Sequence, residues 1–346
     1  FTMSLFSTSI YAINENWWDN TFEYRKNISI TNPNASTLTD FVIYLNISKE
    51  TVMQSDYDDL RFISGTCAGS SNSIFYDYEI EYSNSTNAII WMKIPSFVSG
   101  TNNICMYYGN SSVTSGTSTN VWTNNYGLVY HMESAGNDFS PNNNDKVSDV
   151  GTPTQGSGYF GYTELFDGST DAWNLQDLAY WEAGWNTRTH EVIFETSTDI
   201  TTRQVIFAEG GGTNGVMLYI LSGQIYARWW SESTGFTGGH VNTSISANTL
   251  YYLSMSYDFP GEYNLYLNGI KIGGVATSAT MNAHSGNGGI SYTQGSKDFH
   301  DLSGTGYYFN GVIHELWTQD IANSADFISV RNSNLMDHNT NTVYGY

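Results

Sequence analysis

Tyr263-Asn264-Leu265-Tyr266-Leu267-Asn268-Gly269-Ile270-Lys271-Ile272 is the stretch from which the fold can be inferred. Apolar residues recur at every second position on both sides of the Asn-Gly pair, and this period of two predicts a strand on each side. Asn and Gly accept the positive φ angles that a two-residue hairpin turn requires. The stretch therefore predicts a β-hairpin.

Short segments of the same kind recur along the chain, and turn residues separate them. They are 22–33, 38–45, 59–63, 75–81, 88–95 and 103–110, and then 128–133, 191–196, 204–208, 216–221, 224–230 and 250–257. Short strands at such intervals are typical of β-sandwiches. The Ser/Thr/Gly-rich run 111–120 is typical of a linker, and Ser324 is expected to cap one short helix.

The 346 residues suit two domains rather than one. We expect an all-β protein of two β-sandwich domains, the first over residues 15–122 and the second over residues 123–346. Residues 1–14 precede both domains and alternate like a strand with one phase slip, which predicts a bulged N-terminal strand.

The composition excludes some classes of function. Charged residues make up 13% of the chain and aromatic residues 15%, and 12 basic against 33 acidic residues give a net charge of -21. Such a charge repels nucleic acid, and no run of 18 apolar residues is present that could insert into a membrane. The chain begins at Phe1 rather than at Met. We therefore expect an exported protein at the cell surface, without its signal segment.

Ordered motifs in the first part of the chain resemble one family. Trp17, Tyr24-Arg25 and the segments 59–62, 78–81, 91–95 and 106–110 look in this order like the domain of unknown function 2341. That family is a β-sandwich common in archaeal and bacterial surface proteins. Further along, the segments 128–133, 137–141, 166–169 and 311–317, with the hairpin, resemble a laminin-G-like, concanavalin A-like jelly roll. The resemblance implies a protein that binds or builds rather than catalyses.

A cation site is suggested by the loop 138–145, which offers side-chain oxygens with almost no apolar interruption. Calcium takes six to eight oxygen ligands. The resemblance implies one structural Ca²⁺ near this loop and the Phe-Asp-Gly turn, with Asp138, Asp167 and Asp171 as ligands and Glu315 as a weaker one. The family carries Asp-Glu where this chain has His314-Glu315. The alternative is that such Asn/Asp/Ser/Pro runs simply form turns.

The two cysteines and the glycosylation sequons fit an exported protein. An even cysteine count allows one disulfide between Cys67 and Cys105. Asn-x-Ser/Thr sequons occur at Asn27, Asn34, Asn46, Asn84, Asn110 and Asn242. A chain this rich in Asn, Ser and Thr would also contain about that many by chance.

Catalysis is not predicted. Glu191 and Glu195 share one strand face, but at about 3.3 Å per residue they lie about 13 Å apart. Glycoside hydrolysis requires carboxyl groups about 5 to 9.5 Å apart, depending on the stereochemical outcome. His131 and Glu133 share another strand face, but two residues do not make a metal site, and a structural role is expected for both.

Two functions remain. The first is a structural subunit of an extracellular filament or cell-surface layer, a homopolymer in which the N-terminal strand enters the sheet of a neighbouring copy. The apolar residues of that strand are Phe1, Met3, Leu5, Phe6 and Ile10. The strand could instead pair within its own domain. The alternative function is a carbohydrate-binding adhesin module, with Trp229 or Trp230 as a sugar platform, although core packing is the favoured role of this pair.

Overall fold

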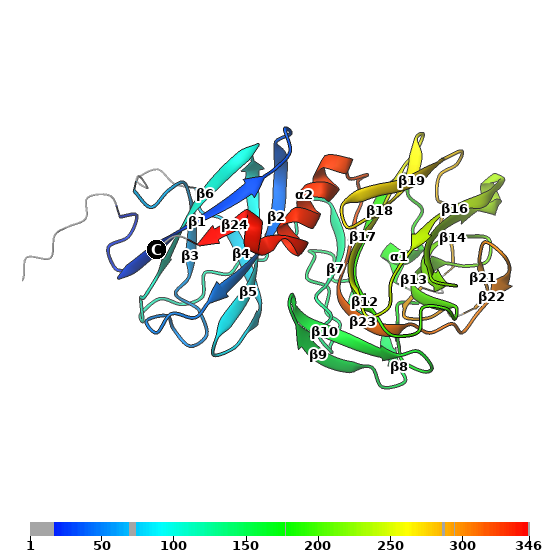
Figure 1. The fold of residues 1–346 in the computed structure, drawn as a ribbon, viewed down its shortest axis with the longest axis horizontal. Helices are drawn as coiled ribbons and strands as arrows, with labels where there is room; N and C mark the ends of the chain where they lie inside the picture. The colour runs from blue at the N-terminus through cyan, green and yellow to red at the C-terminus, as the bar shows by residue number, and fades with distance from the viewer. Residues whose placement is uncertain (1–16, 69–73, 177, 286–287, 294, 345–346) are drawn as a thin grey trace, which may run out of the picture.

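The computed structural model describes residues 17–68, 74–176, 178–285, 288–293 and 295–344. The predicted N-terminal strand, with Phe1, Met3, Leu5, Phe6 and Ile10, lies outside these residues. Two β-sandwiches lie side by side along the long axis of the molecule (Figure 1). The all-β prediction is confirmed.

The first sandwich consists of two antiparallel sheets, in the orders β24-β1-β6-β3 and β2-β5-β4. Its strands are β1 (Tyr24–Asn32), β2 (Leu38–Ser48), β3 (Arg61–Ser64), β4 (Asp77–Ser83), β5 (Asn87–Phe97), β6 (Gly100–Tyr108) and β24 (Thr342–Tyr344). The disulfide Cys67–Cys105 joins β6 to the turn after β3. It indicates an oxidising, non-cytoplasmic compartment.

The second sandwich consists of a sheet in the order β19-β18-β17-β12-β23-β10-β9, with β7 also paired to β23, and a second sheet in the order β16-β15-β14-β13-β20-β11-β8. The strands of the first sheet are β7 (Tyr126–Tyr130), β9 (Thr154–Gly158), β10 (Gly161–Asp167), β12 (Thr187–Thr196), β17 (Leu250–Asp258), β18 (Glu262–Leu267), β19 (Ile270–Ala276) and β23 (Asn310–Gln319). Those of the second are β8 (Ser148–Val150), β11 (Ala172–Asn174), β13 (Gln204–Gly210), β14 (Asn214–Leu221), β15 (Gln224–Ser231), β16 (Phe236–Ser244) and β20 (Gly289–Ile290). The short pair β21 (Lys297–Asp298) and β22 (Ser303–Gly304), the short helix α1 (Ala179–Glu182) and a 3₁₀ turn (Glu232–Thr234) complete this sandwich.

The predicted hairpin is formed by β18 and β19. Asn268 and Gly269 both have positive φ, at 48° and 76°, and Leu267 pairs with Ile270 across the turn. Leu265 is buried between the two sheets of the jelly roll, whereas Tyr266 is buried on the opposite face. Both faces of the sheet are therefore covered at this point, and the second cover comes from outside the jelly roll.

Helix α2 (Ala325–Met336) supplies part of that cover, because it lies between the two sandwiches (Figure 1). Ser324 caps it as predicted, since its side chain accepts a hydrogen bond from the backbone N–H of Phe327. The Phe327 ring packs against Phe41 of β2 at 5.0 Å between centroids, and Arg331 donates to the carbonyl of Val42 at 3.0 Å. The helix thus binds the jelly roll to the first sandwich.

One hydrophobic core continues across the junction of the two sandwiches. Trp91 of β5 meets Trp317 of β23 at 5.3 Å between centroids, and Trp122 packs against both. All three indole rings are fully buried. The boundary predicted at residues 122/123 therefore falls inside a shared core rather than in a solvated linker.

The C-terminus returns to the first sandwich. After α2 and the short helix α3 (His338–Asn341), strand β24 pairs with β1, with Ile28 opposite Tyr344. Residues 342–344 were assigned to the second domain from the sequence, but their hydrogen bonds complete a sheet of the first. No helix within the described residues is long and apolar enough to cross a membrane.

Candidate functional site at the junction of the two sandwiches

The structure does not gather the four predicted cation ligands. Asp138 accepts hydrogen bonds from the backbone N–H groups of Val129, Ser140 and Asn144 at 2.8 to 2.9 Å. Its carboxylate thus holds its own loop together, which agrees with the alternative that the run forms turns. Calcium binding itself stays a prediction.

Of the other three predicted ligands, Asp167 and Asp171 lie in one turn and both accept a hydrogen bond from the Thr170 hydroxyl, whereas Glu315 lies elsewhere. Asp167 accepts hydrogen bonds from the backbone of Ser169, Thr170 and Asp171 in the tight turn after β10. The Asp171 side chain accepts a hydrogen bond from the backbone N–H of Thr152. Glu315 alone belongs to a close group of possible metal ligands among the described residues.

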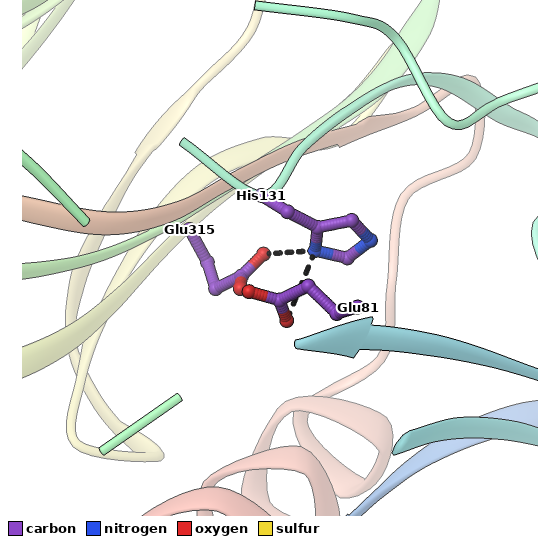
Figure 2. Close-up of side chains that lie close together, drawn as sticks. All are labelled: Glu81, His131 and Glu315. Atoms are coloured by element: carbon purple, nitrogen blue, oxygen red, sulfur yellow. Dashed lines mark hydrogen bonds and ion pairs between the residues drawn. The ribbon is translucent and has the colours of Figure 1, made fainter. Parts of the chain in front are cut away.

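That group consists of Glu81, His131 and Glu315, which we call the junction triad (Figure 2). One ligand atom from each residue lies within 4.8 Å of those from the other two. The Nδ1 atom of His131 is 2.8 Å from Oε2 of Glu315 and 3.5 Å from Oε2 of Glu81. All three side chains are fully buried.

The junction triad draws on both sandwiches. Glu81 comes from β4 of the first, whereas His131 directly follows β7 and Glu315 lies on β23 of the second. β4 shifts register against β5 between Ile80 and Tyr82, so Glu81 is the extra residue of a bulge. Glu79 and Glu81 lie two positions apart on β4 and both point toward the jelly roll, where each of them contacts His131.

Neighbouring hydrogen-bond donors hold the side chains of Glu79, Glu81 and Glu315 in place. Tryptophan N–H groups donate to them, from Trp91 to Glu81 at 2.7 Å, from Trp317 to Glu315 at 3.0 Å and from Trp122 to Glu79 at 2.6 Å. Glu79 Oε1 also lies 2.7 Å from Nε2 of His131. The buried indoles of the shared core therefore hold the site in place as well as packing it.

Burial and charge shift the pKa values of the junction triad. Burial, with the nearby Glu315 carboxylate, raises the pKa of Glu81 well above its ordinary value. Burial also raises the pKa of Glu315. For His131, burial lowers the pKa, but Glu315 and Glu81 outweigh burial and raise it well above that of a free imidazole. The site therefore favours a positive charge at its centre.

A cavity of about 500 Å³ opens beside the junction triad, between the segment 117–123 and the loop 138–143. We call it the junction cleft. Its walls are mostly hydroxyl, amide and carboxylate side chains with a few apolar ones: Glu79, Ile80, Thr117, Ser118, Thr119, Asn120, Thr123, Asp138, Phe139, Ser140, Pro141 and Asn143. Glu79 links the two features, because it lines the cleft and lies within hydrogen-bond distance of His131.

Other sequence candidates lie in the interior. Trp229 and Trp230 are both buried, so neither offers a sugar platform on the surface. Glu191 is buried against Tyr252 and lies 3.9 Å from Arg331, which places it in the contact with α2 rather than in a cleft. The burial of Trp229 and Trp230 agrees with the core-packing role favoured for this pair.

The six sequon asparagines differ in exposure. Asn27 and Asn84 are exposed, and Asn34, Asn46 and Asn242 are half-buried. Asn110 is buried and donates its amide to Thr21 at 2.9 Å. A glycan is attached through this amide nitrogen, so the folded chain presents Asn84 and Asn27 best. Glycosylation stays a prediction.

Two family models match the chain. The model described as "Domain of unknown function (DUF2341)" matches residues 56–148, and the model of the "Concanavalin A-like lectin/glucanases superfamily" matches residues 167–329. The chain carries these two domains in this order. The predicted resemblance is thereby confirmed. No match was found among curated proteins.

Solved structures resemble the chain in part. The binding domain of botulinum neurotoxin serotype D is 13% identical, with a TM-score of 0.48 over 62% of this chain and 52% of that one. The binding domain of Paraclostridial Mosquitocidal Protein 1 is 12% identical, with a TM-score of 0.48 over 60% and 52%. Domain 4 of AbnA, an extracellular arabinanase from Geobacillus stearothermophilus solved with arabinotriose, is 15% identical, with a TM-score of 0.45 over 60% and 98%. The chain thus spans about half the length of the toxin domains that it matches.

Proposed function

We propose that the protein is an extracellular carbohydrate-binding module that holds a neutral glycan in the junction cleft. The observation that carries this proposal is the cleft itself, with its row of hydroxyl and amide side chains beside one aromatic ring. Its volume of about 500 Å³ falls within the range of about 300 to 1,000 Å³ that small-molecule sites occupy. The lectin-containing superfamily of the second domain supports the same class of ligand.

The side chains of the cleft match both the hydroxyl groups of a sugar and the apolar face of its ring. Thr117, Thr119 and Thr123 are exposed and present hydroxyl groups that both donate and accept hydrogen bonds. Phe139 is half-buried and packs against the His131 ring at 4.7 Å between centroids, which keeps the phenyl group in one place. A rigid aromatic face beside polar groups can cover the apolar face of a sugar ring while its hydroxyls are hydrogen-bonded.

Charge narrows the class of glycan. Glu79 and Asp138 line the cleft, and the whole chain carries a net charge of -21. Both would repel sialic or uronic acids, so neutral sugars are the expected ligands. A non-catalytic role is part of the proposal, because Asp138 already accepts hydrogen bonds from its own loop and only Glu79 remains to act on a substrate.

A glycan array followed by calorimetry with neutral and acidic oligosaccharides tests the proposal. We expect binding to neutral glycans, and we expect Phe139→Ala to weaken it at least tenfold by removing the aromatic wall. Thr119→Tyr, at an exposed position, should also weaken binding by filling the cleft. Phe75→Ala is the matched control, since Phe75 is an exposed phenylalanine of the first sandwich that does not line the cleft.

Two outcomes would overturn the proposal. One is an array without a neutral-glycan hit, and the other is sugar binding that both cleft variants leave unchanged. Assembly into a filament through residues 1–14 remains the other prediction from the sequence, and those residues lie outside the described part of the chain. Electron microscopy of the purified protein, with and without residues 1–14, tests that prediction separately.

A further inference from the structure

We propose that Glu81, His131 and Glu315 bind one divalent transition-metal ion, of which Zn²⁺ is the best example, and that this ion ties the two sandwiches together. The proposal goes beyond glycan recognition, because it concerns a buried structural site. A metal here would have ligands from both sandwiches, one from the first and two from the second (Figure 2).

The donor set is one that zinc accepts. Zn²⁺ is bound by His nitrogen at about 2.0 to 2.1 Å and by Asp or Glu oxygen at about 2.0 to 2.2 Å. Donor atoms at such distances from one ion lie about 3 to 4 Å from one another in tetrahedral geometry. The Nδ1 of His131 lies 2.8 Å from an oxygen of Glu315 and 3.5 Å from one of Glu81, so modest side-chain movements would place an ion between them.

Charge gives an independent argument. Three carboxylates and one imidazole meet at the junction, where only Glu79 borders the cleft, and no Lys or Arg forms an ion pair with any of them among the described residues. Even with His131 protonated, the four side chains together retain negative charge unless two carboxyl groups are neutralised. Burying uncompensated carboxylates is costly. A divalent cation at the centre would compensate Glu81 and Glu315 fully.

One buried atom also points to a missing ligand. Oε1 of Glu315 is fully buried and has no hydrogen-bond partner in the described part of the chain. Figure 2 shows the two carboxyl groups of Glu81 and Glu315 facing each other beside the His131 ring. Two carboxylates in that arrangement repel each other unless a proton or a cation lies between them. Either a proton shared between Glu81 and Glu315 or a metal ion would satisfy this oxygen.

Glu79 completes the site as an outer partner. A metal-bound histidine almost always donates its second N–H to a carboxylate, a backbone carbonyl or water. Nε2 of His131 lies 2.7 Å from Glu79 Oε1, so that Nδ1 is the nitrogen that faces Glu81 and Glu315. Calcium fits poorly, because it prefers six or more oxygens and this group offers a nitrogen.

Metal binding by the untagged protein tests the proposal. The protein is stripped with a chelator, dialysed, and titrated with Zn²⁺ by calorimetry, while elemental analysis counts the metal retained after gel filtration. We expect one tightly held ion per chain, a higher unfolding temperature with Zn²⁺, and a visible absorption spectrum of four-coordinate type when Co²⁺ replaces it. Glu315→Gln and His131→Gln should abolish stoichiometric binding, and Glu79→Gln should weaken it about 10- to 100-fold.

A matched control is available in the jelly roll. His190 is also fully buried and lies 2.9 Å from a single glutamate, Glu209, outside the junction triad. His190→Gln should therefore keep full metal binding. If a triad variant fails to fold, the titration of the wild-type protein still tests whether the chain binds a metal ion. A folded wild-type chain that retains no Zn²⁺, Co²⁺, Mn²⁺ or Fe²⁺ overturns the proposal, as does binding that Glu315→Gln leaves unchanged.

Discussion

Lys297 is a buried cation that the fold accommodates at a cost. It begins the short strand β21, and its side chain is fully buried. Its Nζ has no hydrogen-bond partner among the described residues. Burial lowers the pKa of Lys297 from 10.5 to about 7, although the carboxylate of Glu209 raises it in part. We predict that Lys297→Met, which nearly conserves the side-chain volume, makes the protein more stable at neutral pH.

The magnitude follows from the difference between the two pKa values. The unfolded chain keeps the ordinary value of 10.5 and the folded chain has a value of about 7. Each pH unit of that interval corresponds to about 1.4 kcal/mol, so the charged lysine costs up to about 5 kcal/mol below pH 7. The folded pKa is the lower one, so the cost is complete below about pH 7 and disappears as the pH rises toward 10.5. Between about pH 7 and about pH 9 it falls by about 2 kcal/mol.

Urea denaturation of the wild type and of Lys297→Met at these two pH values measures the effect. We expect the stability advantage of the variant to shrink by about 2 kcal/mol between about pH 7 and about pH 9, because all other titrating groups cancel in the comparison. Lys271→Met is the control, since Lys271 is exposed on β19 and pairs with Glu262. Its effect should stay within about 0.5 kcal/mol. A variant that is less stable than the wild type by the same amount at both pH values refutes the reasoning.

Three further predictions concern the junction, the first sandwich and the hairpin. Arg331→Met should cost about 3–5 kcal/mol in urea denaturation, because it breaks the hydrogen bond to Val42 and leaves the buried Glu191 uncompensated; an unchanged midpoint would contradict this. Replacing Cys67 and Cys105 by Ala should cost about 4 kcal/mol, since the bond closes a loop with a sequence separation of 38, and thermal unfolding with and without reductant measures it. Gly269→Ala should cost about 1–2 kcal/mol in the same assay, because the turn needs φ of 76° and the new Cβ would lie 2.8 Å from Cβ of Asn332.

The local elements were largely predictable. Alternation identified the segments that became β12, β13, β14, β15 and β17, and the hydroxyl of Ser324 identified the start of α2. β16 was missed. Its sequence, Phe-Thr-Gly-Gly-His-Val-Asn-Thr-Ser, contains two glycines and few apolar residues, so it pairs with β15 without a strong period of its own. Pairing with β15 in the tertiary structure, rather than a local sequence pattern, makes this segment a strand.

The junction triad was not predicted as a unit. Glu315 was a candidate for calcium, His131 was considered only beside Glu133, and Glu81 was seen only as part of a family motif. The one available signal was Glu79 and Glu81 at alternate positions of a predicted strand, followed by an aromatic residue. Nothing local shows that this face of β4 meets a histidine 50 residues later in the chain.

The sequence by itself determined the hairpin of β18 and β19, the helix cap, the disulfide pair and the order of the two domains, because each depends on residues close together in the chain or on a residue type that has only one possible partner. Only the tertiary structure decided that the two sandwiches share a core, that β24 returns to the first of them, and that Glu81, His131 and Glu315 meet. Side chains 184 residues apart become neighbours only when both domains fold and pack. Their pKa values shift for the same reason, because burial and opposing charge exist only in the folded state.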